Sequence, residues 1–159
     1  MTDIRTVPLL DVPRGNAPLR DEIIAAITAV IDSGRFLFGP DVQKLEAACA
    51  RWSGTAHGVG CASGSDALLL SLMAMDIKPG DEVITVPNSY IATAQAIALV
   101  GATPVFVDVD ENTMNMDLNL VQTAITPKTK ATIPVHLYGF PVDIHQLRTI
   151  VGEDIYILE

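Results

Sequence analysis

Apolar residues in the first third of the chain recur at the three- and four-residue spacing of helices. A first amphipathic helix is predicted to begin near Pro18 and to end just before Gly34. The same spacing then returns and continues to about Trp52, and Pro40 suits the first position of this second helix. We therefore assign residues 1–54 to an N-terminal helical segment.

From residue 56 onward the pattern changes to short runs rich in β-branched residues, separated by helical stretches. Strands that alternate with helices pair in parallel through right-handed crossovers, and ligands bind at the carboxyl ends of the strands. We predict an α/β fold with a mostly parallel sheet and covering helices, in a βα-repeat domain at residues 55–159. Five strands are expected, at residues 56–62, 81–86, 103–109, 130–137 and 154–158.

The last expected strand runs up to Glu159 with no helix after it. A parallel strand normally continues into a loop and then into a helix that covers the sheet. We therefore expect the βα-repeat domain to be incomplete and the sequence to be part of a longer protein. On this expectation the isolated chain exposes strand edges and apolar helix faces, and it dissolves poorly or associates.

Composition and charge narrow the classes of partner. Apolar residues make up 49% of the chain, and the formal net charge is -9. Nucleic-acid surfaces need clustered Lys and Arg, which this sequence lacks, so we expect no nucleic-acid partner. The apolar runs are too short to cross a bilayer and no secretory signal is visible, so we expect a cytoplasmic protein without a membrane partner.

The chain has two cysteines, Cys49 in an expected helix and Cys61 in an expected strand. Two are too few for a disulfide framework or a zinc site, so we expect both to be reduced residues that pack in the interior.

A phosphate-binding turn is one interpretation of the segment between the first expected strand and the helix after it. Ser63, Gly64, Ser65 and Asp66 bring backbone N–H groups and hydroxyls to a helix N-terminus, where phosphate groups bind. An ordinary helix cap made by Ser65 or Asp66 is the other interpretation, because a cap satisfies the same N–H groups without a ligand. The local sequence leaves both open.

Two nucleotide-binding patterns are not supported. Gly58, Gly60 and Gly64 resemble a dinucleotide-binding motif, but their spacing is one residue too long. Such a site also needs an acidic residue at the end of the second strand, where only Asn88 is present. The glycine-rich loop of nucleoside-triphosphate enzymes is absent from the sequence.

The segment after the third expected strand resembles a calcium loop only in part. Asp108, Asp110 and Asn112 offer oxygen ligands, but Thr113 stands where the motif requires glycine and Asn119 where it requires glutamate. We interpret the two aspartates as loop residues and predict no metal site.

Two further side chains are expected near the carboxyl ends of strands. Tyr90 follows the second strand, so its ring either stacks on a planar cofactor or packs half-buried. His136 ends the fourth strand, where an imidazole donates to a bound anion or transfers a proton. His57 and His145 have no such placement and are interpreted as structural.

Five segments in this order and spacing resemble the DegT/DnrJ/StrS family of sugar aminotransferases. The segments read GRFLFGPDVQKLE, SGSDALLLSL, KPGDEVITVPNSYIATAQAI, GATPVFVDVD and PVHLYGFPVDI, and the resemblance covers nearly the whole chain. The resemblance implies a fold type I aminotransferase that binds pyridoxal 5'-phosphate (PLP) between a large and a small domain, usually as a homodimer. It also implies that residues 55–159 are the incomplete large domain.

The same resemblance implies roles for individual residues. Gly64, Ser65 and Asp66 would hold the phosphate group of PLP, with Ser65 in place of the more common threonine. Tyr90 would stack on the pyridine ring, where other members often have Phe or Trp. His136 is a possible lining residue of the active site.

The resemblance further implies that catalysis needs residues not found here. Family members use an aspartate just after the fifth strand and a later lysine that binds PLP covalently. None of the lysines of this chain is placed for that role; the chain has Lys44, Lys78, Lys128 and Lys130. We therefore expect the isolated chain to be inactive.

Three functions remain open from the sequence. The first is transfer of an amino group, with glutamate as the implied donor, to a keto-sugar nucleotide. The second is a module that binds phosphate or cofactor without catalysis. The third is a sugar dehydratase of the same family, in which histidine replaces the lysine.

Overall fold

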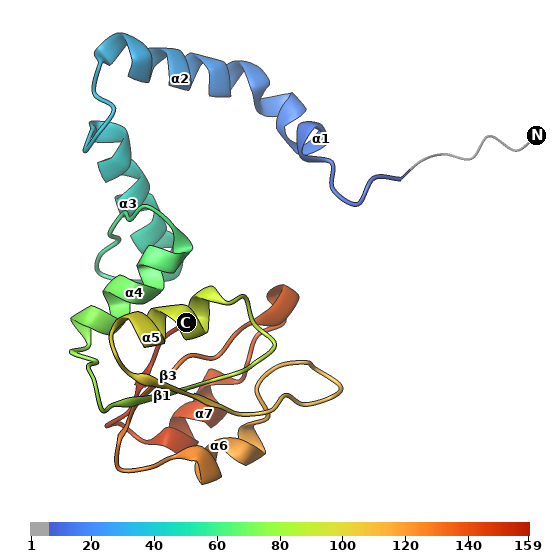
Figure 1. Ribbon diagram of the computed structural model, residues 1–159. Coiled ribbons are helices and arrows are strands. Elements are labelled where there is room, and N and C mark those ends of the chain that lie inside the picture. Colours follow the sequence, from blue (N-terminus) through green and yellow to red (C-terminus); the bar gives the residue numbers. More distant parts are fainter. Residues whose placement is uncertain (1–6) are drawn as a thin grey trace, which may run out of the picture. The chain divides into compact units, whose positions relative to one another are not determined.

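The computed structural model describes residues 7–159, which form two compact units (Figure 1). One unit reaches to Gly60, and the other runs from Cys61 to Glu159. The helices described in the first unit are α1 (Val12–Asn16), the 3-10 helix η1 (Ala17–Leu19), α2 (Arg20–Ser33) and α3 (Pro40–Ser53).

The two helices expected near the N-terminus are confirmed as α2 and α3. Gly34 ends α2 in a left-handed conformation (φ 63°), and Gly54 does the same for α3 (φ 66°). These are positions that glycine occupies without steric cost. Pro40 takes the first position of α3, where its missing N–H is not needed. Almost all residues of the two helices are at least partly exposed, since α2 has no buried residue and α3 has only Ala50.

The second unit contains a parallel sheet of four strands in the order β2-β1-β3-β4, so the predicted α/β class is confirmed. The strands are β1 (Glu82–Thr85), β2 (Thr103–Phe106), β3 (Thr129–Thr132) and β4 (Tyr156–Ile157). Pro104 lies in β2, where an edge strand tolerates the missing N–H. Pro134 follows β3 by two residues and cannot donate to a neighbouring strand, which explains why β3 is shorter than predicted.

The strand predicted at residues 56–62 is wrong. These residues form no strand because no segment between residues 7 and 159 pairs with them, and a strand requires a hydrogen-bonded neighbour. Cys61 therefore lies in an exposed loop, and Cys49 is also exposed. The expectation that both cysteines are packing residues is not met in the described structure.

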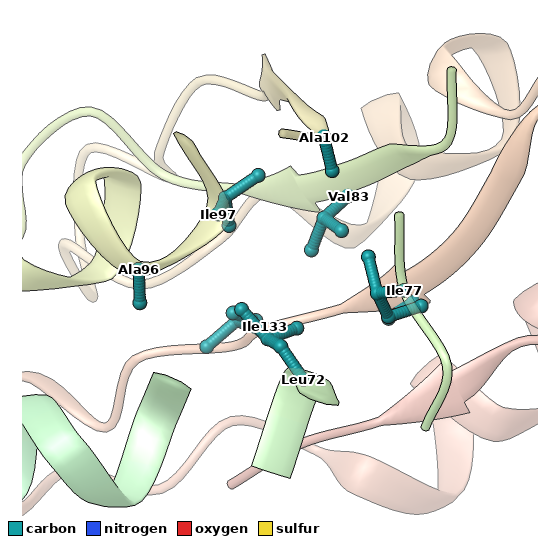
Figure 2. Packing of buried hydrophobic residues seen from close by; sticks show 8 residues of the cluster. Leu72, Ile77, Val83, Ala96, Ile97, Ala102 and Ile133 are labelled. Atoms are coloured by element: carbon teal, nitrogen blue, oxygen red, sulfur yellow. The ribbon is translucent and has the colours of Figure 1, made fainter. Parts of the chain in front are cut away.

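Helices cover both faces of the sheet. On one face lie α4 (Gly64–Ala74) and α5 (Ala92–Leu99), and on the other α6 (Leu118–Ala124) and α7 (Ile144–Val151). The first face carries a core in which Leu72 of α4, Ile97 of α5 and Val83 of β1 are completely buried. Figure 2 shows their side chains converging with Ile133, just past β3. Burial of such a side chain contributes about 1.5–3 kcal/mol.

In this topology the strand order reverses between β1 and β3. The chain leaves β1 through α5 on one face to reach β2, and it leaves β3 through α7 on the other face to reach β4. The loops after two adjacent parallel strands thus diverge to opposite faces, and ligands in open α/β sheets bind at such a point. Separately, no helix described between residues 7 and 159 has both the length and the apolar character needed to cross a membrane.

Candidate functional site

The N-terminus of α4 begins one residue after Ser63, which forms its cap. The Ser63 backbone is extended (φ -162°, ψ 168°), and its Oγ accepts a hydrogen bond of 3.1 Å from the backbone N–H of Asp66. The carbonyl oxygen of Ser63 accepts the N–H of Ala67 at 2.9 Å. The alternative in which Ser65 or Asp66 is the cap is therefore wrong, because Ser63 already occupies that position.

This capping arrangement leaves three donors available at the start of α4. Among the residues that the structure describes, the N–H groups of Gly64 and Ser65 and the hydroxyl of Ser65 have no protein partner. Gly64 also has no heavy atom within 4 Å of the position that a Cβ would take. Free N–H groups at the positive end of an 11-residue helix can bind an anion.

Asp66 contributes to this turn in a different way from its neighbours. Its N–H is already engaged by Ser63, and its partly buried carboxylate lies in the first turn of α4. A carboxylate there stabilises the positive helix end but repels a bound phosphate. The donors free to bind an anion therefore belong to Gly64 and Ser65.

The start of α4 lies at the same edge of the sheet as the loop that carries Tyr90. A short turn connects the end of α4 to the amino end of β1, so α4 runs antiparallel to β1 and begins at the carboxyl edge of the sheet. α5 follows β1, begins at the same edge and packs against α4 (Figure 1). Tyr90 precedes α5 by two residues, and its side chain is 78% exposed.

Hydrogen bonds fix the backbone on either side of Tyr90. The side-chain amide of Asn88 donates to the carbonyl oxygen of Met114 at 2.9 Å. The hydroxyl of Ser89, before α5, lies 3.0 Å from that of Thr93 in the first turn of α5. Tyr90 therefore presents an exposed aromatic ring on a loop fixed by hydrogen bonds, and such a ring can stack on a planar ligand.

His136 lies four residues past the end of β3, beyond the strand in which it was predicted. Its Nδ1 lies 3.0 Å from the backbone N of Val142, and its Nε2 lies 3.1 Å from Oε2 of Glu159. Both ring nitrogens are engaged within the chain. In this arrangement His136 has no free N–H to offer a bound anion.

Asn115 has a structural role that the sequence did not reveal. Its buried side chain donates to the carbonyl oxygen of Phe140 at 2.8 Å and accepts the N–H of Leu137 at 3.2 Å. Between these contacts Tyr138 adopts a left-handed backbone (φ 53°), which costs a non-glycine residue energy. A polar residue in a polar loop carries no pattern that marks such a contact.

The lysines of the sheet-containing unit lie away from the carboxyl edge. Lys78 precedes the Pro79–Gly80 turn before β1 and forms an ion pair with Asp76 at 2.7 Å. Lys128 and Lys130 lie at the amino end of β3. Within Cys61–Glu159 no lysine therefore reaches the edge that carries Tyr90 and His136.

The aspartates after β2 cap local turns. Oδ1 of Asp110 accepts the N–H groups of Asn112 at 3.0 Å and Thr113 at 2.9 Å. Oδ1 of Asp108 accepts the N–H of Val109 at 2.8 Å. Across the described residues no group of three His, Cys, Asp or Glu side chains is arranged to hold a metal ion.

The sequence pattern that defines the DegT/DnrJ/EryC1/StrS aminotransferase family matches residues 18–159. The chain belongs to this family. It is 53% identical over 144 residues to the UDP-N-acetyl-3-dehydro-alpha-D-glucosamine 3-aminotransferase of Acidithiobacillus ferrooxidans, with 91% of this chain and 39% of that protein covered. The chain thus spans about two fifths of the length of this relative.

Solved structures of DegT-family proteins share the fold. The crystal structure of DesV from S. venezuelae in complex with a ketimine intermediate matches with a TM-score of 0.91 and 46% identity, covering 95% of this chain and 41% of DesV. A GDP-4-keto-6-deoxymannose-3-dehydratase with a trapped PLP-glutamate geminal diamine matches with a TM-score of 0.80 and 35% identity, covering 86% and 37% of the two chains. The relatives and solved structures that this chain resembles thus include both an aminotransferase and a dehydratase.

Proposed function

We propose that this chain is the cofactor-phosphate-binding part of a PLP-dependent sugar aminotransferase. The observation that carries the proposal is the set of free donors at the start of α4, which belong to Gly64 and Ser65. These donors suit a phosphate group, and PLP carries one. Asp66 would complete the turn by placing its N–H on Ser63 and so fixing the direction of the first two N–H groups.

Tyr90 would hold the ring of the cofactor. The α4 N-terminus and the Tyr90 loop lie at the same edge of the sheet, so a ligand with a phosphate at one end and an aromatic ring at the other can contact both. His136 lies on the loop after β3, the strand next to β1, and would line the site through its position.

The proposed reaction transfers an amino group, with glutamate as donor, to a keto-sugar nucleotide. When bound, PLP delocalises the electron pair left after the amino donor loses a proton. The residues of this chain would bind and orient the cofactor. The relatives that act on UDP- and GDP-linked sugars support this substrate class.

We propose that the residue that binds PLP covalently lies in the part of the longer protein that this chain does not cover, since the relatives extend well beyond the matched segment. We further propose that the whole protein is a cytoplasmic homodimer. A dehydratase is the second candidate, because the solved dehydratase shares the fold at 35% identity. A lysine at the covalent position predicts amino transfer, and a histidine predicts dehydration.

Substitution of Gly64 tests the phosphate site directly. Proline is favoured at the first helical position and its preceding residue must be extended, as Ser63 is, so Gly64→Pro removes one N–H without disturbing α4. Because hydrogen bonds to charged groups contribute about 1.5–3 kcal/mol, equilibrium dialysis of the full-length protein should show PLP affinity reduced at least about tenfold. Gly64→Ala keeps the N–H and is the matched control. Equal PLP affinity of the proline and alanine variants would contradict the proposed site.

The reaction is tested in two stages, first with glutamate alone and then with a keto-sugar. The full-length protein loaded with PLP should form one equivalent of 2-oxoglutarate per site before any sugar is added, because the first half-reaction needs no acceptor. Glutamate alone does not separate the two candidates, because the solved dehydratase also binds glutamate through PLP. Product analysis after addition of a UDP-linked keto-sugar separates them. An amino sugar supports the proposal, and a deoxy sugar without nitrogen contradicts it.

A further inference from the structure

The hydrogen bonds of His136 determine which ring nitrogen carries the proton. The backbone N–H of Val142 can only donate, so Nδ1, at 3.0 Å, must accept and be unprotonated. The ring proton then lies on Nε2, which donates to Oε2 of Glu159 at 3.1 Å. Together the two contacts define a neutral imidazole in the Nε2–H form. A charged imidazole would point a second N–H at the N–H of Val142.

The imidazole bridges two segments where backbone pairing is ending. The β3–β4 ladder consists of Ala131 with Tyr156 and Thr132 with Ile157, followed by a 3.0 Å hydrogen bond from Leu158 N–H to the carbonyl oxygen of Thr132. Beyond these residues His136 makes the next link, from the loop after β3 to Glu159. Its side chain is 31% exposed, so the link is partly shielded from water.

The same imidazole also holds the loop after β3 together. Its bond to Val142 joins the two ends of the segment 136–142. Asn115 holds the middle of this segment through Leu137 and Phe140. The loop is therefore fixed at both its ends and its middle, and its shape depends on which nitrogen of His136 accepts.

We propose that His136 is a positioning residue that acts as the neutral Nε2–H imidazole. It sets the end of β4 against the loop 136–142 and thereby fixes the carboxyl edge of the sheet beside the candidate cofactor site. The effect on the cofactor rests on the proposed function, whereas the assignment of the proton does not. His136 acts in this account without touching the cofactor or the reacting atoms.

The proton assignment is tested by nitrogen NMR of the full-length protein labelled with ¹⁵N-histidine at neutral pH. We expect Nδ1 of His136 to have no attached proton and Nε2 to have one. Glu159→Gln and Glu159→Ala should both keep this form, because the N–H of Val142 still donates to Nδ1. Only Glu159→Ala should shift the Nε2 signal clearly, because its acceptor is then lost, whereas the Gln carbonyl oxygen still accepts. A proton on Nδ1 in the folded protein, or an Nε2 signal unaffected by Glu159→Ala, would overturn the assignment.

The positioning role is tested by PLP affinity. His136→Ala should weaken binding about fivefold, the size of one net hydrogen bond, and His136→Gln should recover most of the loss by placing an N–H near Glu159. Glu153→Gln removes an exposed charge before β4 and is the control. Unchanged affinity in His136→Ala overturns the positioning role and leaves the proposed function intact. Failure of the unsubstituted protein to bind PLP overturns the proposed function. The proton assignment does not depend on PLP binding and is decided by the NMR experiment alone.

Discussion

The hydroxyl of Thr85 donates a buried hydrogen bond of 3.0 Å to the carbonyl oxygen of Ile133. This contact joins the last residue of β1 to the first residue after β3, next to a backbone hydrogen bond of 2.8 Å from Ile133 N–H to the carbonyl oxygen of Ile84. Pro134 follows Ile133 and has no N–H to extend the pairing. The Thr85 side chain therefore continues the link between β1 and β3 at the carboxyl ends of these strands.

Valine substitutions at two buried threonines should have opposite effects on stability. Thr85→Val leaves the carbonyl oxygen of Ile133 without its partner and should lower the free energy of unfolding by about 1–3 kcal/mol. Thr132 is equally buried, but no atom of the described residues forms a hydrogen bond with its hydroxyl. Thr132→Val removes that unpaired group and should leave the protein at least as stable. Urea denaturation measures both values, and a larger loss for Thr132→Val would contradict the assignment.

Two glycines in left-handed conformations separate backbone strain from steric overlap. A Cβ at Gly101 (φ 80°) would lie 2.6 Å from Cγ of Pro79, whereas a Cβ at Gly80 (φ 98°) meets no atom within 4 Å. Gly80→Ala should cost about 1–2 kcal/mol of stability from backbone strain alone. Gly101→Ala should cost more, because Pro79 must also move. Thermal unfolding of the two variants compares them, and equal losses would show that Pro79 yields freely.

The turn after β2 should respond to acid through Asp110. Hydrogen bonds from the N–H groups of Thr113 and Asn112 lower the pKa of Asp110 below 3.8. A lowered pKa means that the charged form stabilises the folded turn above pH 3.8, and that this stabilisation is lost as pH falls through the folded-state pKa. Amide NMR signals of Thr113 and Asn112 should shift in that range. In Asp110→Asn, which keeps an acceptor oxygen without titrating, the shift should disappear.

Periodicity was sufficient for the helices and for most of the sheet. α2 and α3 have apolar positions at helical spacing with proline or glycine at their ends, so local sequence determines them. The strands β1 to β4 follow from short β-rich runs between helices. The run at residues 56–62 has the same appearance, but strand formation depends on a neighbouring strand, which local sequence does not specify.

The candidate site was predicted only in outline. The segment around Gly64 was recognisable because glycine and hydroxyl residues precede an apolar helix, yet the choice of Ser63 as the cap depends on the backbone angle of that residue. The contacts of Asn115 with Phe140 and of His136 with Glu159 join segments more than 20 residues apart. Such contacts arise from the packing of loops on the sheet and leave no periodic signal.

The central claim is that Gly64 and Ser65 bind the phosphate of PLP, and amide NMR of the full-length protein tests it most directly. On addition of PLP, the N–H signals of Gly64 and Ser65 should move strongly, because these groups gain a charged acceptor. The N–H of Asp66, already bonded to Ser63, should move less. Pyridoxal, which lacks the phosphate, should leave all three unchanged. If PLP leaves the Gly64 and Ser65 signals in place, the phosphate does not bind at the start of α4 and the account is wrong.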